Sequence, residues 1–218
     1  MATPGLLFPG LKDTYPVRKQ RADAELTIAQ NEKGAPVWTP RRVERISYST
    51  VDGRSFVQVG PRAVSIHRLR PYERWESFCE QIKGVYAQLL GIVGPTPFER
   101  VGLRYINRLD IPGPEINLDE YLMFKPRTGL GVSEPMVDVQ MACTFGTGEG
   151  VDAYRVVLAS LVPDEKGKNS FALDIDYFAR VPGAIEHDCA LAWVDTAHSK
   201  VECVFEGCIT DKLRVLFK

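Results

Sequence analysis

The stretch from residue 98 to 112 (FERVGLRYINRLDIP) alternates apolar and polar positions along most of its length. Such alternation is typical of a β-strand with one buried face, because successive side chains of a strand point to opposite sides. The apolar positions share one face: Val101, Leu103, Tyr105, Leu109 and Ile111. The other face carries Arg100, Arg104 and Arg108. The pattern therefore predicts a long strand with a basic stripe on one side.

The residues on either side of this strand repeat one order of elements. Short alternating runs predict strands at 43–50, 55–59 and 63–69, and apolar positions at helical spacing predict a helix from Pro71 to about residue 93. A second set follows, with strands at 137–145, 153–162 and 170–181 and a helix over about 184–206. Asn117 and Thr210 are expected to cap short helical segments at 117–122 and 211–217.

This order of elements predicts the fold class. Three meandering strands followed by a helix usually form an antiparallel sheet with its helices on one face. We therefore expect an α+β fold: a curved, mostly antiparallel sheet of about seven strands, built from two βββα halves, with two long helices on one face. The other face of the sheet would be open to solvent, to a ligand or to a second subunit.

The first 40 residues differ from the rest, because five prolines are scattered among charges and no apolar period is kept. We expect residues 1–40 to form an extended or partly disordered arm. Residues 41–218 would then form a single α+β domain with pseudo-duplicated halves 41–112 and 113–218.

Charge is unevenly spread along the chain. Residues 1–112 hold 17 Lys/Arg against 11 Asp/Glu, a balance of +6, whereas residues 113–218 have a balance of −7 and the whole chain −1. Two explanations stay open: the halves attract each other across a sheet or dimer interface, or the basic half faces an anionic ligand.

The cysteines and the apolar runs bear on where the protein resides. The five cysteines are an odd number, and most have apolar neighbours. This pattern favours reduced thiols in the core of a cytoplasmic protein. Cys79, Cys143 and Cys189 are expected to be among these core thiols. No signal peptide or membrane-spanning run is visible.

The basic stripe is the main candidate site. Arginine forks suit carboxylates and phosphates, so it could pair with Asp110, Asp174 and Asp176 or could hold a ligand. The candidate residues for an anion site are Arg100, Arg104, Tyr105, Asn107, Arg108, Arg68 and Arg70. Nucleic-acid binding through the basic half is the less favoured alternative, because few aromatic residues lie among the charges.

Other motifs offer little chemistry. The glycine-rich run 146–150 (GTGEG) lies between two expected strands, which predicts a hairpin turn rather than a phosphate loop. Asp195 and His198 are one helical turn apart, which suits a surface ion pair or an acid–base pair. The histidine and cysteine spacings do not match a metal site, so we expect no metal and no cofactor, and the catalytic residues, if any, are unknown.

Three blocks of sequence resemble a sporadically distributed bacterial family of uncharacterised proteins. Residues 69–75 (LRPYERW), 101–112 (VGLRYINRLDIP) and 205–212 (FEGCITDK) resemble its conserved segments, the middle one most specifically. The family has no assigned activity, and its patchy occurrence implies a mobile or defence-related locus. Its members begin with an additional strand, so the resemblance implies an edge strand left bare here.

These observations favour a cytoplasmic, non-enzymatic binding or interaction module. We expect a homodimer or a protein partner, and no membrane. The alternatives are a sensor or enzyme for an anionic, nucleotide-like molecule held by the arginine stripe, and a nucleic-acid-binding protein.

Overall fold

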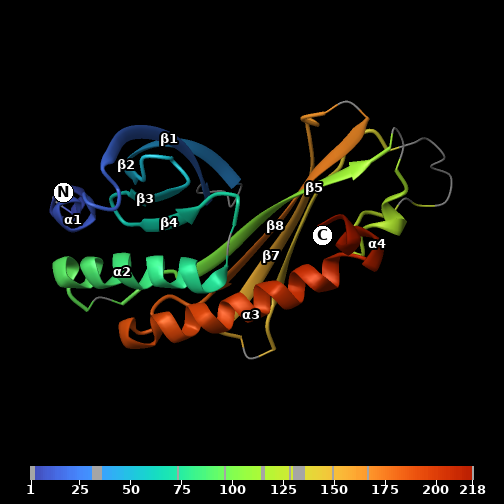
Figure 1. Ribbon diagram of the computed structural model, residues 1–218. Helices are drawn as coiled ribbons and strands as arrows, with labels where there is room; N and C mark the ends of the chain where they lie inside the picture. Colours follow the sequence, from blue (N-terminus) through green and yellow to red (C-terminus); the bar gives the residue numbers. More distant parts are fainter. Residues whose placement is uncertain are drawn as a thin grey trace. The chain divides into compact units, whose positions relative to one another are not determined.

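The structure is a computed structural model, and it describes residues 3–30, 36–72, 74–95, 97–113, 116–127, 129, 136–148, 150–165 and 167–217. The chain divides into two compact units, Met1–Thr96 and Pro97–Lys218. Each unit contains a four-stranded antiparallel sheet followed by a long helix, so the fold class is α+β, as predicted (Figure 1). The division follows residue 96, between the first expected helix and the long strand.

The prediction of one sheet of about seven strands is wrong. The long strand β5 (Gly102–Pro112) pairs with β8 (Lys168–Ala179), a strand of the second half, and the described strands of the two units form separate sheets. Alternation reveals that a segment is a strand, but it does not reveal which strand lies beside it.

The first unit contains α1 (Thr3–Leu11), β1 (Val17–Gln30), β2 (Pro36–Ser49), β3 (Ser55–Val59), β4 (Val64–Arg68) and α2 (Trp75–Val93). Its strands lie in the order β1-β2-β3-β4. The expected arm therefore supplies a helix, a complete strand and the start of another. β1 pairs with β2 over its full length, from Val17 opposite Ser49 to Gln30 opposite Pro36.

Both helices of the first unit contribute to one apolar cluster with its sheet. Leu7 and Leu11 of α1 are buried with Tyr48 of β2, Val57 of β3 and Val85 of α2. Phe8 stacks on Tyr48 with 5.4 Å between ring centroids. Burial of several large apolar side chains, at about 1.5–3 kcal/mol each, gives this unit its core.

The second unit contains β5, the 3₁₀ turn η1 (Leu118–Glu120), β6 (Gln140–Gly146), β7 (Asp152–Leu161), β8, η2 (His187–Cys189), α3 (Ala190–Cys208), α4 (Asp211–Arg214) and η3 (Val215–Phe217). The strand order is β5-β8-β7-β6, all antiparallel. β5 lies beside β8 at one edge of the sheet.

The helix α3 packs along one face of this second sheet (Figure 1). That face carries Leu109 and Ile111 of β5 and Leu173 and Ile175 of β8, all 0% exposed. Tyr105 contacts His198 of the helix, with 6.0 Å between ring centroids. The helix face of the sheet is thus the apolar face that the alternation predicts.

Three local predictions are confirmed. The Asn117 side chain accepts a hydrogen bond from the Asp119 N–H at 3.0 Å, and the Thr210 hydroxyl accepts one from the Leu213 N–H at 3.3 Å. The glycine-rich run joins β6 to β7 as a hairpin turn, in which Gly150 has φ +79°. A left-handed φ favours glycine, which has no Cβ to clash.

The prediction of core cysteines is only partly right. Cys79 and Cys208 are buried and Cys143 is partly buried, but Cys189 and Cys203 are exposed. The reason for Cys189 is that α3 begins at Ala190, later than the apolar spacing suggests, so Cys189 is not on its buried stripe.

Candidate functional site: the arginine face of the second sheet

The basic stripe lies on the face of the second sheet that α3 does not cover. Leu103, Leu109 and Ile111 point to the helix side, and alternate residues of β5 therefore point away from it. The strand register brings together the side chains of this second face, which we call the arginine face: Arg104, Ile106, Arg108 and Asp110 of β5, Ser170, Ala172, Asp174 and Asp176 of β8, Arg155, Val157, Ala159 and Leu161 of β7, and Gln140, Ala142 and Thr144 of β6. Arg100, just before β5, folds onto the same face.

Arg104 forms a two-pronged ion pair across the strands. Its Nε lies 2.8 Å from Oδ1 of Asp174, and its Nη2 lies 2.5 Å from Oδ2 of the same carboxylate. The Asp174 side chain is 14% exposed and that of Arg104 is 57% exposed. The hydrogen bonds to Asp174 raise the pKa of Arg104 above its ordinary value, and burial opposes them. This parallel geometry is the strongest that arginine and a carboxylate can form.

Arg100 pairs with the next carboxylate along β8. Its Nη2 lies 2.6 Å from Oδ2 of Asp176, and its guanidinium carbon lies 4.7 Å from the ring centroid of Phe178. Gly102 lies between Arg100 and Arg104, and a Cβ there would be 2.9 Å from Nη1 of Arg100. The absence of a side chain at Gly102 therefore lets the guanidinium lie close to the strand.

Arg108 is held by several partners. Its Nε lies 2.9 Å from Oδ1 of Asp110, and its Nη2 lies 3.1 Å from the Ser170 hydroxyl and 3.3 Å from Oδ2 of Asp164. The Ser170 hydroxyl donates to Asp110 at 2.5 Å. This hydrogen bond lowers the pKa of Asp110, burial opposes the shift, and Arg108 lowers the pKa further. Only 20% of the Arg108 side chain is exposed.

The arginine face is therefore nearly neutral. Its four arginines are set among three aspartates, and each arginine of the predicted stripe has a carboxylate partner. Between the ion pairs lie apolar side chains, of which Ile106 is 65% exposed and Leu161 37% exposed. Pairing with carboxylates, one of the two interpretations of the stripe, is the arrangement that the structure has: Arg100 and Arg104 pair across the strands, and Arg108 pairs with Asp110 on its own strand.

The structure brings only some of the candidate anion-site residues together. Arg100, Arg104 and Arg108 share the arginine face. Tyr105 and Asn107 point to the helix side, where the Tyr105 hydroxyl lies 3.3 Å from Nδ1 of His198 and the Asn107 amide donates to the Leu173 carbonyl at 3.2 Å.

The other two candidates belong to the first unit. Arg68 ends β4, and Arg70 follows it in an exposed position before Pro71. Arg68 lines a pocket beneath α2, whereas Arg70 does not.

The histidine of the Asp195/His198 pair has other contacts. His198 lies against Tyr105 through Nδ1, and its Nε2 is 3.4 Å from Oε1 of Glu202. This places His198 in a small polar cluster between α3 and the sheet. Glu202, one turn along the helix at i+4, is the acidic partner that the structure adds.

Sequence reasoning missed two polar groups inside the protein. Asp152 accepts hydrogen bonds from the Tyr177 hydroxyl at 3.0 Å and from the Trp193 indole N–H at 3.1 Å. In the first unit, Tyr15 and Gln81 meet beneath α2. Neither group has a local signal, because its members are far apart in sequence.

No protein-family model, curated protein sequence or solved structure matches the chain. Within the described ranges, no three His, Cys, Asp or Glu side chains are placed to hold a metal ion together. The helices of the described part of the chain include none that is both long and apolar enough to cross a membrane.

Proposed function

We propose that the chain is a non-enzymatic interaction protein that pairs with a second copy of itself through the arginine face. The observation that carries the proposal is the pairing of the stripe arginines with carboxylates on the same face, around exposed apolar side chains. Arginine is enriched in protein interfaces, and homodimer interfaces are more apolar than the rest of the surface, whereas basic stripes are typical of surfaces that bind nucleic acid.

The charge pattern suits a two-fold interface. A two-fold axis places the same patch on both sides of the contact, so the patch must be complementary to itself. The arginine face meets this condition, because a basic row lies beside an acidic row and a rotated copy can place its acidic row against the partner's basic row. The basic row is Arg100, Arg104 and Arg108, and the acidic row is Asp174 and Asp176. A stripe of one sign would repel its own copy.

The size of the face is also sufficient. Four strands at about 4.8 Å spacing, each about ten residues long at about 3.3 Å per residue, present roughly 600 Å² per chain. Two such faces would bury about 1,200 Å², which is the lower end of stable and specific interfaces. Two sheets that pack face to face are a common arrangement in β-sandwiches.

The paired charges weaken the two alternative functions at this face. An anionic ligand or a nucleic-acid backbone would have to displace Asp174 from Arg104 and Asp110 from Arg108, and each displaced carboxylate would then lie close to the incoming anion. A protein partner can keep these ion pairs and pack on the apolar positions between them.

Sedimentation velocity over a range of concentrations tests the proposal. For the wild-type chain, we expect the mass to rise from that of one chain, 24.4 kDa, toward that of two. Ile106→Lys should hold the chain as a monomer, because it buries a charge in the contact while its cross-strand neighbour Asp174 tolerates a lysine in the single chain. Val51→Lys, at an 85% exposed turn position of the first unit, is the matched control and should associate normally.

Two results would contradict the proposal. A wild-type chain that stays monomeric at all concentrations would exclude pairing. A dimer that Ile106→Lys leaves intact would place the contact elsewhere. If the wild type is monomeric but binds nucleic acid with a steep dependence on salt, the nucleic-acid alternative would replace the interaction function.

A further inference from the structure

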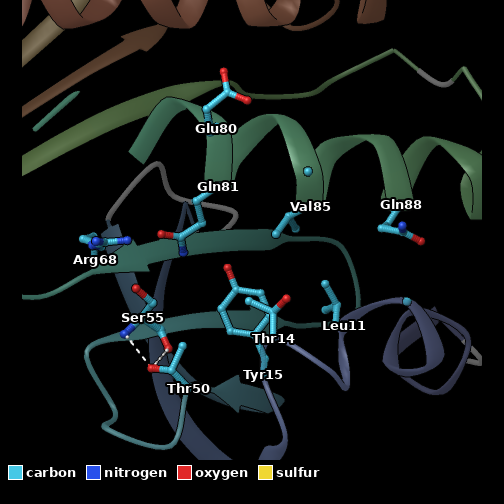
Figure 2. Close-up of a pocket in the computed structure, with 12 residues that line it drawn as sticks. Leu11, Thr14, Tyr15, Thr50, Ser55, Arg68, Glu80, Gln81, Val85 and Gln88 are labelled. Atoms are coloured by element: carbon cyan, nitrogen blue, oxygen red, sulfur yellow. Dashed lines mark hydrogen bonds between the residues drawn. The ribbon is translucent and has the colours of Figure 1, made fainter. Parts of the chain in front are cut away.

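The first unit contains a pocket with a mixed apolar and polar lining between α2, α1 and the end of its sheet (Figure 2). Its volume is about 430 Å³, within the range of small-molecule sites. The apolar part of its lining is formed by Leu11, Val85 and the two glycines Gly10 and Gly84. The polar part carries hydroxyl, amide and charged groups: Thr14, Tyr15, Thr50, Ser55, Arg68, Glu80, Gln81 and Gln88.

A smaller hollow of about 230 Å³ shares part of this lining. Thr50, Ser55 and Arg68 border both hollows, and Arg54 and Asp52 add to the smaller one. Arg68 is thus the basic side chain common to both.

The charges of the pocket favour an anion. Among the described residues that line it, Arg68 is the basic one and Glu80 the acidic one. Glu80 is exposed, and its Oε1 lies 2.9 Å from Nζ of Lys83, so a surface lysine neutralises it. Arg68 is half-buried. Burial raises the pKa of Tyr15, and the positive charge of Arg68 opposes this rise.

Gln81 gives a second and independent indication of a ligand. Its Nε2 donates to the His67 carbonyl at 3.4 Å, but its Oε1 is buried and has no hydrogen-bond partner among the described residues. Figure 2 shows the Gln81 side chain extending from α2 toward the sheet, between Arg68 and Tyr15. A buried polar atom is rarely left unpaired, so this acceptor beside a hollow is open to a donor from a bound molecule or from an ordered water.

We propose that this pocket binds a small hydroxylated anion, with its carboxylate or phosphate on Arg68 and one of its hydroxyl groups donating to Oε1 of Gln81. The hydroxyl and amide side chains around the pocket suit the other hydroxyl groups of such a molecule. Burial keeps Tyr15 protonated, because it raises the pKa of the phenol, so Tyr15 remains available as a hydrogen-bond donor. The site lies wholly within the first unit and does not depend on self-association.

Two glycines of α2 allow a closely matched test. Gly84 lines the pocket and Gly91 does not, and a Cβ added at either position would meet no atom within 4 Å. The two positions are seven residues apart on one helix, and leucine raises helix propensity equally at both. Gly84→Leu should therefore fill the pocket, and Gly91→Leu should leave it open.

The assay is thermal unfolding of the full chain with D-gluconate, D-glucose 6-phosphate and, as a neutral control, D-glucose. A ligand that binds only the folded state raises the Tm in a concentration-dependent way. We expect at least one of the two anions to raise the Tm of the wild type and of Gly91→Leu, and to leave that of Gly84→Leu unchanged. Arg68→Gln should weaken the apparent affinity about tenfold or more, because a charge-assisted contact is lost.

The choice of probes assigns each outcome. A shift with gluconate alone identifies a carboxylate ligand, and a shift with glucose 6-phosphate alone identifies a phosphate ligand. The proposal is overturned if neither anion raises the Tm, if glucose raises it equally, or if the shift persists in Gly84→Leu. None of these results depends on the oligomeric state, which Ile106→Lys tests separately.

Discussion

The ion pair between Arg104 and Asp174 predicts an asymmetry between its two alanine variants. Arg104→Ala leaves a carboxylate that is 14% exposed without its bidentate partner. Asp174→Ala leaves a guanidinium that is 57% exposed and that water can solvate. Removal of the more exposed partner should therefore destabilise the fold more than removal of the more buried one.

The expected magnitudes follow from these exposures. An exposed ion pair contributes about 0.2–1 kcal/mol to stability, so Asp174→Ala should lower the free energy of unfolding by about 0.5 kcal/mol. A buried charged group that loses its partner also carries a desolvation cost of about 1–3 kcal/mol, and partial exposure of Asp174 reduces this cost. Arg104→Ala should therefore lower the free energy of unfolding by about 1–2 kcal/mol.

Urea denaturation at pH 7 measures both values. The protein concentration should be low enough for the chain to be monomeric, so that unfolding is not linked to association. The double variant completes the thermodynamic cycle, and the coupling energy should be about 1 kcal/mol. If Asp174→Ala lowers the free energy of unfolding as much as Arg104→Ala or more, the buried carboxylate does not depend on its partner for stability, and the inference from exposure is refuted.

Three further predictions concern other parts of the second unit. Ser170→Ala should raise the pKa of Asp110 toward its ordinary value. Because a lowered pKa stabilises the fold at pH values above the ordinary pKa, the variant should lose part of this stabilisation, and what remains should disappear at a higher pH as the solution is acidified. An unchanged titration of Asp110 by carbon-13 NMR would contradict the role of the hydroxyl. Cys208, whose pKa burial raises to about 11, should be alkylated far more slowly than the exposed Cys203 in the native protein, with equal rates in denaturant; equal native rates would show that Cys208 is not buried. Thr210→Ala should lower the free energy of unfolding by about 1 kcal/mol, because it removes a helix cap, and a loss below the error of urea denaturation would count against that cap.

The sequence predicted local elements well because their signals are local. The helices α2 and α3 and the strand β5 follow apolar spacings that a single segment displays, although the ends of α3 are shifted. The capping roles of Asn117 and Thr210 were also predictable, because a cap depends on residues two or three positions away.

The sequence did not predict the two separate sheets or the strand β1. β1 carries many polar residues, and its ladder with β2 over 14 residue pairs is a matter of backbone hydrogen bonds that no side-chain pattern reveals. Because β1 pairs with β2, residues 17–30 of the expected arm belong to the first sheet. The partner of β5 was equally hidden, because strand pairing depends on the fold as a whole.

The candidate site was predictable in part. The alternation placed Arg100, Arg104 and Arg108 on one face, and Asp174 and Asp176 were recognisable as their counterparts. The pocket beneath α2 was not predictable, because Tyr15 comes from the expected arm and meets Gln81 only through the tertiary fold.

Hydroxyl-radical footprinting at low and high protein concentration tests the central claim most directly, because it reports the exposure of individual side chains. We predict that Ile106 and Leu161, on the arginine face, become protected as the concentration rises. Val51, in the first unit, should be oxidised equally at both concentrations. Unchanged oxidation of Ile106 and Leu161 in a sample that sedimentation shows to be dimeric would place the interface elsewhere and contradict the account.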